Sequence, residues 1–118
     1  MIPDYERKLL YLFKKQNGQC AITGKLLTLA CKIDMHHVLP DTKVNHKLYK
    51  LYIDSVWNLV LVFHDAHITK PLPKHPPECQ IRLAEGLLAQ YPGMEYMDME
   101  NALKRYSRVN IESNGEPY

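Results

Sequence analysis

The run from Val56 to Phe63, VWNLVLVF, constrains the fold of this chain more than any other feature. Its β-branched and aromatic residues favour an extended strand, and its apolar character indicates that the strand is buried. A candidate helical turn over residues 64–70 follows directly, and four prolines between residues 71 and 77 then interrupt regular structure. The middle of the chain is therefore predicted to be a buried strand followed by a turn of helix.

Helical spacing flanks this centre on both sides. Apolar residues among charged ones predict an amphipathic helix over about 4–16, which the pair Asn17-Gly18 ends. Two further helices are predicted over about 78–90 and 96–107, although Gly86 weakens the first of them. The apolar faces of these later helices either complete the core or meet a partner.

The region between the first helix and the buried run is expected to be mostly extended or irregular. Residues 20–25 read as a tight loop, and residues 26–36 as one or two short strands. The polar, basic stretch 41–55 has room for a short helix. A chain of 118 residues is long enough for a single domain spanning 1–118.

Composition excludes several classes of protein. The chain lacks a run of about 18 apolar residues, and its first residues do not resemble a signal peptide, so a cytoplasmic protein is expected. The three cysteines, Cys20, Cys31 and Cys79, are odd in number and without CxxC spacing, which argues against a disulfide framework.

Charge is distributed unevenly along the chain. Residues 1–50 hold nine Lys or Arg and four Asp or Glu, whereas residues 51–118 hold six and nine, for a net formal charge of +2. A basic first half permits an anionic partner such as nucleic acid, but charges that only solvate the surface fit equally well.

All six histidines fall within residues 36–75. Histidine is the commonest metal ligand and the natural base near neutral pH. Adjacent residues on a strand point to opposite faces, so His36 and His37 need not share one role. His64 and His67 are three residues apart, which places them on one face of a helix. Two strand ends and a helix can therefore converge these four side chains on one ion.

This arrangement resembles the HNH endonuclease family. The family pattern has an acid, a spacer, a histidine pair and a downstream proline, then an asparagine at the head of an apolar strand and a histidine nine residues later. The matching segments are Asp34-Met35-His36-His37-Val38-Leu39-Pro40, Asn58-Leu59-Val60-Leu61-Val62 and His67. The match covers residues 18–69. It implies a small α+β domain with a ββα-metal motif there, flanked by helices.

The resemblance implies a role for each matched residue. His37 would be the general base that takes a proton from the attacking water, and His36 and His67 would bind one divalent metal ion. Asn58 would hold the loop between the strands and orient the base by its amide. Asp34 would accept a ring N–H from a histidine, and a solvated carboxylate at the strand edge is the equally weighted alternative.

The implied chemistry is phosphodiester hydrolysis by an endonuclease, giving 5′-phosphate and 3′-hydroxyl products. By family analogy DNA is favoured over RNA as substrate. Mg, Mn, Ni and Zn all stay open as the ion, and two imidazole ligands favour a transition metal. Sequence specificity and oligomeric state are not predicted, although cutting both strands would suggest a dimer or two successive nicks.

The chain departs from many relatives at the structural zinc site. Of four expected cysteine positions only Cys20 is cysteine, because the others are Thr23, Phe63 and Ala66. A closed zinc site needs four ligands, so a structural zinc is not expected, with a replacement site from Cys20, Cys31 and His64 as the alternative. His64 could also serve the catalytic ion or point away from it.

Basic and aromatic residues near the motif have two interpretations. They either contact phosphates and bases or simply solvate and pack the domain. The candidates for phosphate contact are Lys43, Lys47, Lys50 and Lys70, and those for stacking are Tyr49 and Tyr52. His46 and His75 are interpreted as surface residues, and Trp57 as core.

Two other classes of function compete with a nuclease. A catalytically inactive nucleic-acid-binding module would keep the fold, but it would need neither the base nor an open metal site. A His-rich structural metal-binding interaction protein would favour closed coordination by Cys and His, which the missing cysteines oppose.

Overall fold

The computed structural model describes residues 4–28, 30–69 and 73–105, except for the side chain of Thr69. It is a small α+β fold, which confirms the predicted class. In chain order the elements are α1 (Asp4–Lys15), β1 (Ile33–His37), α2 (Lys43–Leu48), the 3₁₀ helix η1 (Val56–Asn58), β2 (Leu59–Phe63), α3 (His64–Thr69), α4 (Glu78–Gln90) and the 3₁₀ helix η2 (Met94–Tyr96). Residues 99–105 are also helical.

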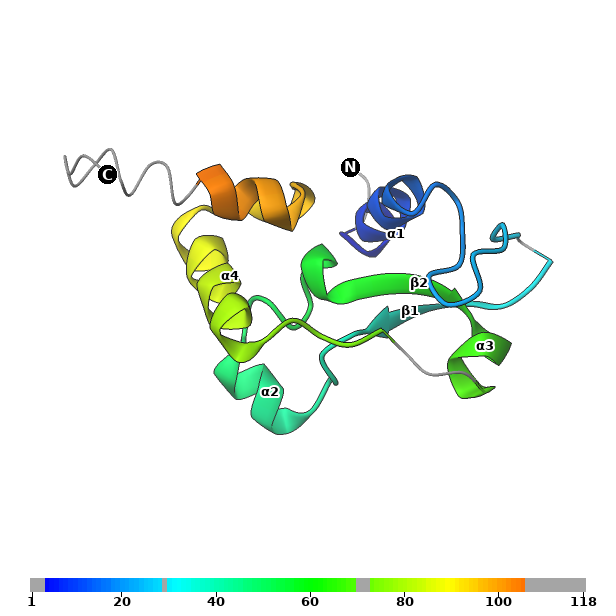
Figure 1. Ribbon diagram of the computed structural model, residues 1–118, viewed down its shortest axis with the longest axis horizontal. Helices are drawn as coiled ribbons and strands as arrows, with labels where there is room; N and C mark the ends of the chain where they lie inside the picture. The colour runs from blue at the N-terminus through cyan, green and yellow to red at the C-terminus, as the bar shows by residue number, and fades with distance from the viewer. Residues whose placement is uncertain (1–3, 29, 70–72, 106–118) are drawn as a thin grey trace.

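A two-stranded antiparallel sheet forms the centre of the molecule (Figure 1). Its register pairs Ile33 with Phe63 and His37 with Leu59. Helix α1 crosses one face of the sheet, and α3 continues from β2 and packs back against both strands. The expected order of strand, strand and helix is therefore present, with β1 the only strand that residues 26–36 form within the described part; Leu26 makes an isolated bridge to Gln19.

Gln16 protects the outer edge of β2. Its amide donates to the Leu61 carbonyl at 2.9 Å and accepts from the Leu61 N–H at 2.8 Å. The chain reverses immediately after α1, with positive φ at Asn17 and Gly18. The reversal brings Ala21 N–H within 3.0 Å of the same Leu61 carbonyl. A strand edge that would otherwise attract another chain is thus paired within the molecule.

The first part of the apolar run is not a strand. Val56–Asn58 form the 3₁₀ helix η1, and the strand begins only at Leu59, so the prediction of a strand from residue 56 is wrong there. The reason is tertiary: Trp57 donates its indole N–H to the Met97 carbonyl at 2.5 Å, and Asn58 turns inward with no exposed surface. A straight strand would send these neighbouring side chains to opposite faces.

Helix α4 packs into the same core as the sheet. Its bounds are those predicted, and Ile81, Ala84 and Leu87 on one face are buried. The third predicted helix is divided into η2 and the helical residues 99–105, while residues 106 and 107 lie outside the described part. The buried core comprises Leu12, Cys20, Leu27, Leu39, Tyr49, Tyr52, Ile53, Val56, Trp57, Leu59, Leu61, Val62, Ile81, Ala84, Leu87, Leu88 and Ala102.

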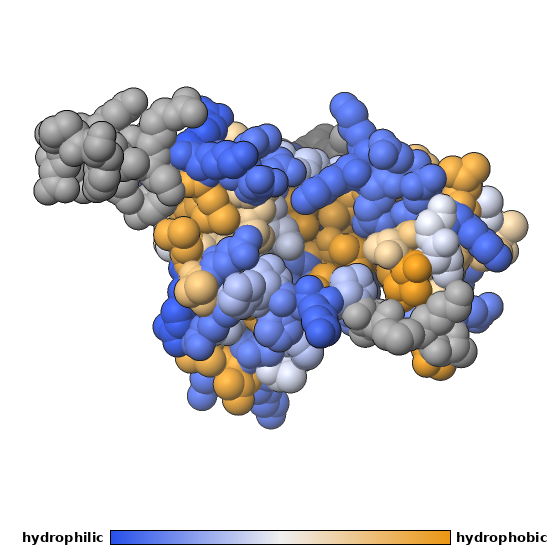
Figure 2. Space-filling view, in the orientation of Figure 1, coloured by the Kyte–Doolittle hydropathy of each residue, from blue (hydrophilic) through white to orange (hydrophobic). Residues whose placement is uncertain are grey.

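The surface separates into polar and apolar areas. Figure 2 shows hydrophilic side chains over α1 and an apolar strip beneath them, where the sheet lies. Within the described residues, no helix has both the length and the apolar character to cross a bilayer.

Candidate functional site

The alternation of strand β1 divides the predicted site residues between two faces of the sheet. Asp34 and His36 are directed to the side of α3, where Asp34 meets His64 and His67. His37 is directed to the other side, where it shares a pocket with residues of α1. The structure thus separates the two adjacent histidines as strand geometry requires.

Asp34 holds the two histidines of α3. Its Oδ2 atom lies 2.6 Å from His64 Nδ1 and 3.1 Å from His67 Nδ1. Burial opposes ionisation of Asp34, but the hydrogen bonds from His67 and His64 outweigh it and lower the pKa of the carboxyl group. Because a carboxylate only accepts, both rings donate from Nδ1, which leaves each Nε2 as the ligand nitrogen.

His36 lies beside His67, with ring centroids 4.5 Å apart and planes tilted by 58°. Its Nε2 atom is buried and has no hydrogen-bond partner among the described residues. Burial lowers the pKa of His36, and the neighbouring His67 and His37 lower it further. A neutral imidazole with an unpaired nitrogen is the form that binds a metal ion, and a bound cation would remove the cost of leaving that nitrogen unpaired.

His37 contacts a carboxylate on the opposite face of β1. Its Nε2 atom lies 2.9 Å from Asp54 Oδ1, and the imidazole remains partly exposed. Despite their separate faces, His36, His37 and His67 line one open pocket of about 300 Å³ at the end of the strand. Asp41 lines it too. The three histidines that the sequence motif singles out therefore border a common space.

Asn58 acts on the backbone. It accepts from the Leu39 N–H at 2.7 Å and donates to the Leu39 and Ile53 carbonyls at 3.1 and 2.9 Å. The side chain has no exposed surface. All its described hydrogen bonds go to main-chain atoms, so the expected loop-holding role matches this geometry. The expected contact between its amide and His37 is not among the described hydrogen bonds, so any influence of Asn58 on His37 passes through the backbone.

Three residues near His37 were not identified from the sequence. Asp41, His46 and Asp54 surround it: His46 pairs with Asp41, and its Nδ1 lies 3.9 Å from Asp54 Oδ2. Among the described residues, His37, Asp41 and Asp54 are the one group of three whose ligand atoms all lie within 4.8 Å of one another. His46 was interpreted as an ordinary surface residue, and no spacing rule connects Asp54 to the motif.

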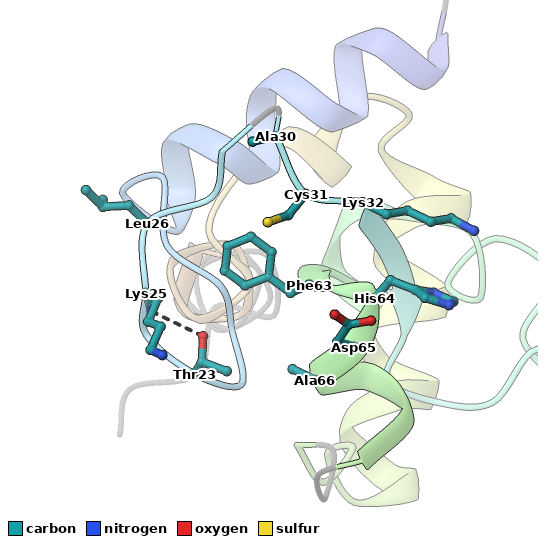
Figure 3. A pocket seen from close by; sticks show the side chains of 10 residues that line it. All are labelled: Thr23, Lys25, Leu26, Ala30, Cys31, Lys32, Phe63, His64, Asp65 and Ala66. Atoms are coloured by element: carbon teal, nitrogen blue, oxygen red, sulfur yellow. Dashed lines mark hydrogen bonds between the residues drawn. The ribbon is translucent and has the colours of Figure 1, made fainter.

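Three of the positions that were compared with a structural zinc site line a pocket that is partly apolar. Thr23, Phe63 and Ala66 line it, and Figure 3 shows the Phe63 ring between the loop that carries Lys25 and helix α3. Cys20 lies beneath and accepts hydrogen bonds from the N–H groups of Thr23 and Phe63 at 3.5 and 3.4 Å. Burial opposes ionisation of Cys20, but hydrogen bonds from the Thr23 side chain and from the backbone of Thr23, Phe63 and Ile22 lower the pKa of the thiol.

The alternative zinc site from Cys20, Cys31 and His64 has no geometric support within the described residues. Cys20 is buried while Cys31 is exposed, and the three do not form a group of close ligand atoms. His64 lines the same pocket, but Figure 3 shows its ring extending away from Phe63. Its nearest described partner is Asp34.

Among the described candidates for nucleic-acid contact, the lysines are exposed and the tyrosines are buried. Lys43 and Lys47 are exposed on α2, and Lys50 is exposed just beyond it. Lys70 lies outside the described residues. Tyr49 and Tyr52 are buried in the core, so they pack rather than offer faces to bases. His75 is exposed and contacts only the neighbouring Pro76 carbonyl among the described hydrogen bonds.

Comparisons with protein-family models, with curated proteins and with solved structures find no match for this chain. The fold and the site alone define its class. It is a small α+β protein with a two-stranded sheet, a short helix packed on it, and a histidine-lined pocket where the first strand ends.

Proposed function

We propose that this protein is a metal-dependent nuclease of the HNH type, which hydrolyses phosphodiester bonds of nucleic acid. The observation that carries the proposal is the pocket bordered by His36, His37 and His67. His67 lies 30 residues beyond His37 in the sequence, yet both line this pocket, and such convergence is what a single metal site needs. DNA is the favoured substrate by family resemblance alone.

The donor set suits a single divalent ion. His36 and His67 would hold it, with Asp34 keeping the His67 ring oriented through Nδ1. When bound, a divalent ion supplies Lewis-acid stabilisation of negative charge on the phosphoryl oxygens. Two imidazole ligands favour Mn, Ni or Zn over Mg.

His37 is the proposed general base. It lies on the far face of β1 from His67 yet borders the same pocket, so a phosphodiester in that pocket can be approached from two sides. The imidazole takes a proton from water as the water oxygen attacks phosphorus. Separate directions for the base and for the ion are what in-line attack requires.

The decisive experiment is cleavage of supercoiled plasmid DNA and of a structured RNA by the purified chain. Mg, Mn, Ni and Zn are supplied in turn, with chelator as the blank. We expect metal-dependent nicking, and a loss of at least about 100-fold in His37→Ala. His75→Ala is the matched control, because that exposed imidazole lies outside the pocket.

Metal binding is measured separately by calorimetry. Retained ion binding with no cleavage of either nucleic acid would refute the catalytic proposal and favour an inactive binding module. Loss of the ion in a His36→Ala and His67→Ala double variant, with a folded chain, is the expected result for the ligand assignment.

A further inference from the structure

The contact between His37 and Asp54 bears on which ring nitrogen of His37 is free to accept a proton. We propose that Asp54 is the positioning residue of His37: it fixes the imidazole with its proton on Nε2, so that Nδ1 accepts the proton of the attacking water. The inference rests on the proposed nuclease function for its catalytic meaning, but the His37–Asp54 pairing can be tested without any activity.

The pairing follows from distance and donor chemistry. His37 Nε2 lies 2.9 Å from Asp54 Oδ1. An ionised carboxylate has no proton to give, so in neutral His37 the Nε2 atom must be the donor. The lone pair available for chemistry is then on Nδ1. In serine proteases a buried carboxylate performs the same task for the catalytic histidine: it orients the ring and fixes its tautomer. Asp54 is more accessible, with 56% of its side chain exposed.

Contacts elsewhere in the fold fix the positions of both His37 and Asp54. The Asn58 side chain binds Leu39, two residues after His37, and Ile53, the residue before Asp54. Lys8 of α1 donates to the main-chain carbonyl of Asp54 at 2.5 Å. The strand end that carries the base and the loop that carries the carboxylate are therefore fixed to one another by Asn58.

The proton balance is simple. Water loses an O–H bond, its oxygen bonds to phosphorus, and His37 Nδ1 takes the proton. The bond from phosphorus to the leaving oxygen breaks, and that oxygen takes a proton from solvent. Asp54 exchanges no proton in this scheme: it stays ionised and holds the imidazolium that forms.

A different role for Asp54 is the competing interpretation. With Asp41 and His37 it belongs to a group whose ligand atoms are close enough to share a cation. An ion at that position would occupy His37 itself, so the two roles exclude each other. Metal binding by Asp54→Asn distinguishes them, because the variant loses an ion only if Asp54 is a ligand.

The first measurement is the ¹⁵N spectrum of the His37 ring in the metal-free chain, at a pH where imidazole is neutral. We expect wild type to carry its proton on Nε2 alone. In Asp54→Asn the new amide can donate as well as accept, so both tautomers should appear. Asp98→Asn is the control, because Asp98 caps the last helix and asparagine caps equally well.

The second measurement separates kcat from KM in the metal-loaded protein. Asp54→Asn should lower kcat by about 10- to 100-fold with KM changed less than about twofold, and Asp54→Glu should restore part of kcat. The number of ions bound should be unchanged in Asp54→Asn.

Three results would overturn the inference: a wild-type proton on Nδ1, an unchanged kcat in Asp54→Asn, or the loss of a bound ion in that variant. If wild type cleaves nothing, the nuclease proposal fails, and the tautomer measurement still decides whether Asp54 positions His37.

Discussion

At the scale of single residues, Asn58 joins the two loops beside the pocket without bordering it. Its amide is fully buried and satisfies three backbone groups of two loops. In Asn58→Ala these groups lose their partners inside the core. Because unpaired buried polar groups are costly, we expect the free energy of unfolding to fall by about 2–4 kcal/mol, measured by urea denaturation.

The control for that prediction is Asn45→Ala. Asn45 also donates to a loop carbonyl, that of Pro40 at 2.8 Å, but in an exposed position. Water can replace its bond, so its loss should cost less than about 1 kcal/mol. Equal losses in the two variants would mean that burial of the Asn58 amide is not what makes it important.

Tyr52 is a second buried polar residue, with a hydroxyl that lacks a hydrogen-bond partner among the described residues. Burial raises its pKa to about 12. Since the folded pKa exceeds the ordinary value near 10, the linked stability is intact below about pH 10 and is lost as pH rises towards 12. We expect Tyr52→Phe to be neutral or stabilising at pH 7, and to lose less stability than wild type between pH 10 and 12.

The test is urea unfolding of both proteins across that pH range. A Tyr52→Phe variant that is destabilised by more than about 2 kcal/mol at pH 7 would show that the hydroxyl has a partner after all.

Single residues also show where sequence reasoning ends. His36, His37 and His67 could be selected because their spacing from Asp34 and Asn58 is a property of the chain. Asp54 could not, because its contact with His37 arises only when the buried Asn58 amide joins the loops at Leu39 and Ile53. Contacts that depend on loop closure leave no periodic signal in a sequence.

At the scale of elements, replacing either of two glycines by alanine should have opposite effects on stability. Gly18 follows α1 with φ of +68°, and a Cβ there would lie 3.1 Å from the Phe13 ring. Gly86 lies within α4, and a Cβ there would meet nothing within 4 Å. Gly18→Ala should destabilise by about 1–2 kcal/mol, whereas Gly86→Ala should stabilise by about 0.5–1 kcal/mol.

Thermal unfolding of the two variants beside wild type measures both effects in one experiment. The pair is informative because the chemical change is identical. If Gly86→Ala is destabilising instead, the added methyl group must clash with a neighbouring atom, which contradicts the open space around Gly86 in this structure.

The elements differ in how far the sequence predicts them. Helix α4 has the predicted bounds because its apolar spacing, the preceding prolines and the packed face all agree. The segment Val56–Asn58 has strand-forming residues but is a 3₁₀ helix. There, the hydrogen bonds of Trp57 and Asn58 to distant backbone outweigh local preference, which is the expected limit of propensity arguments.

At the scale of the whole molecule, two acidic residues of α4 hold the loop that follows α2. Glu85 of α4 accepts from the backbone N–H groups of Leu51 and Tyr52, the latter at 2.6 Å. Glu78 accepts from the Tyr49 hydroxyl and from Arg82. The apolar face of α4 completes the core, which answers the question the sequence left open. Apart from Arg82 these partners are uncharged, so they do not offset the basic charge of the first half, and the lysines of α2 remain the candidates for an outside anion.

Metal binding should stabilise the whole fold, because the proposed ligands come from β1 and α3, which the unfolded chain does not hold together. At a free Ni or Zn concentration 100 times the Kd, stability should rise by about 2.7 kcal/mol, which is on the order of 10 °C in Tm for a chain of this size. The His36→Ala and His67→Ala double variant should show no such shift. An Asp41→Asn and Asp54→Asn double variant should keep it in full. The reverse pattern would move the ion to the group of His37, Asp41 and Asp54. His37 would then be a ligand, and the pocket would need another base.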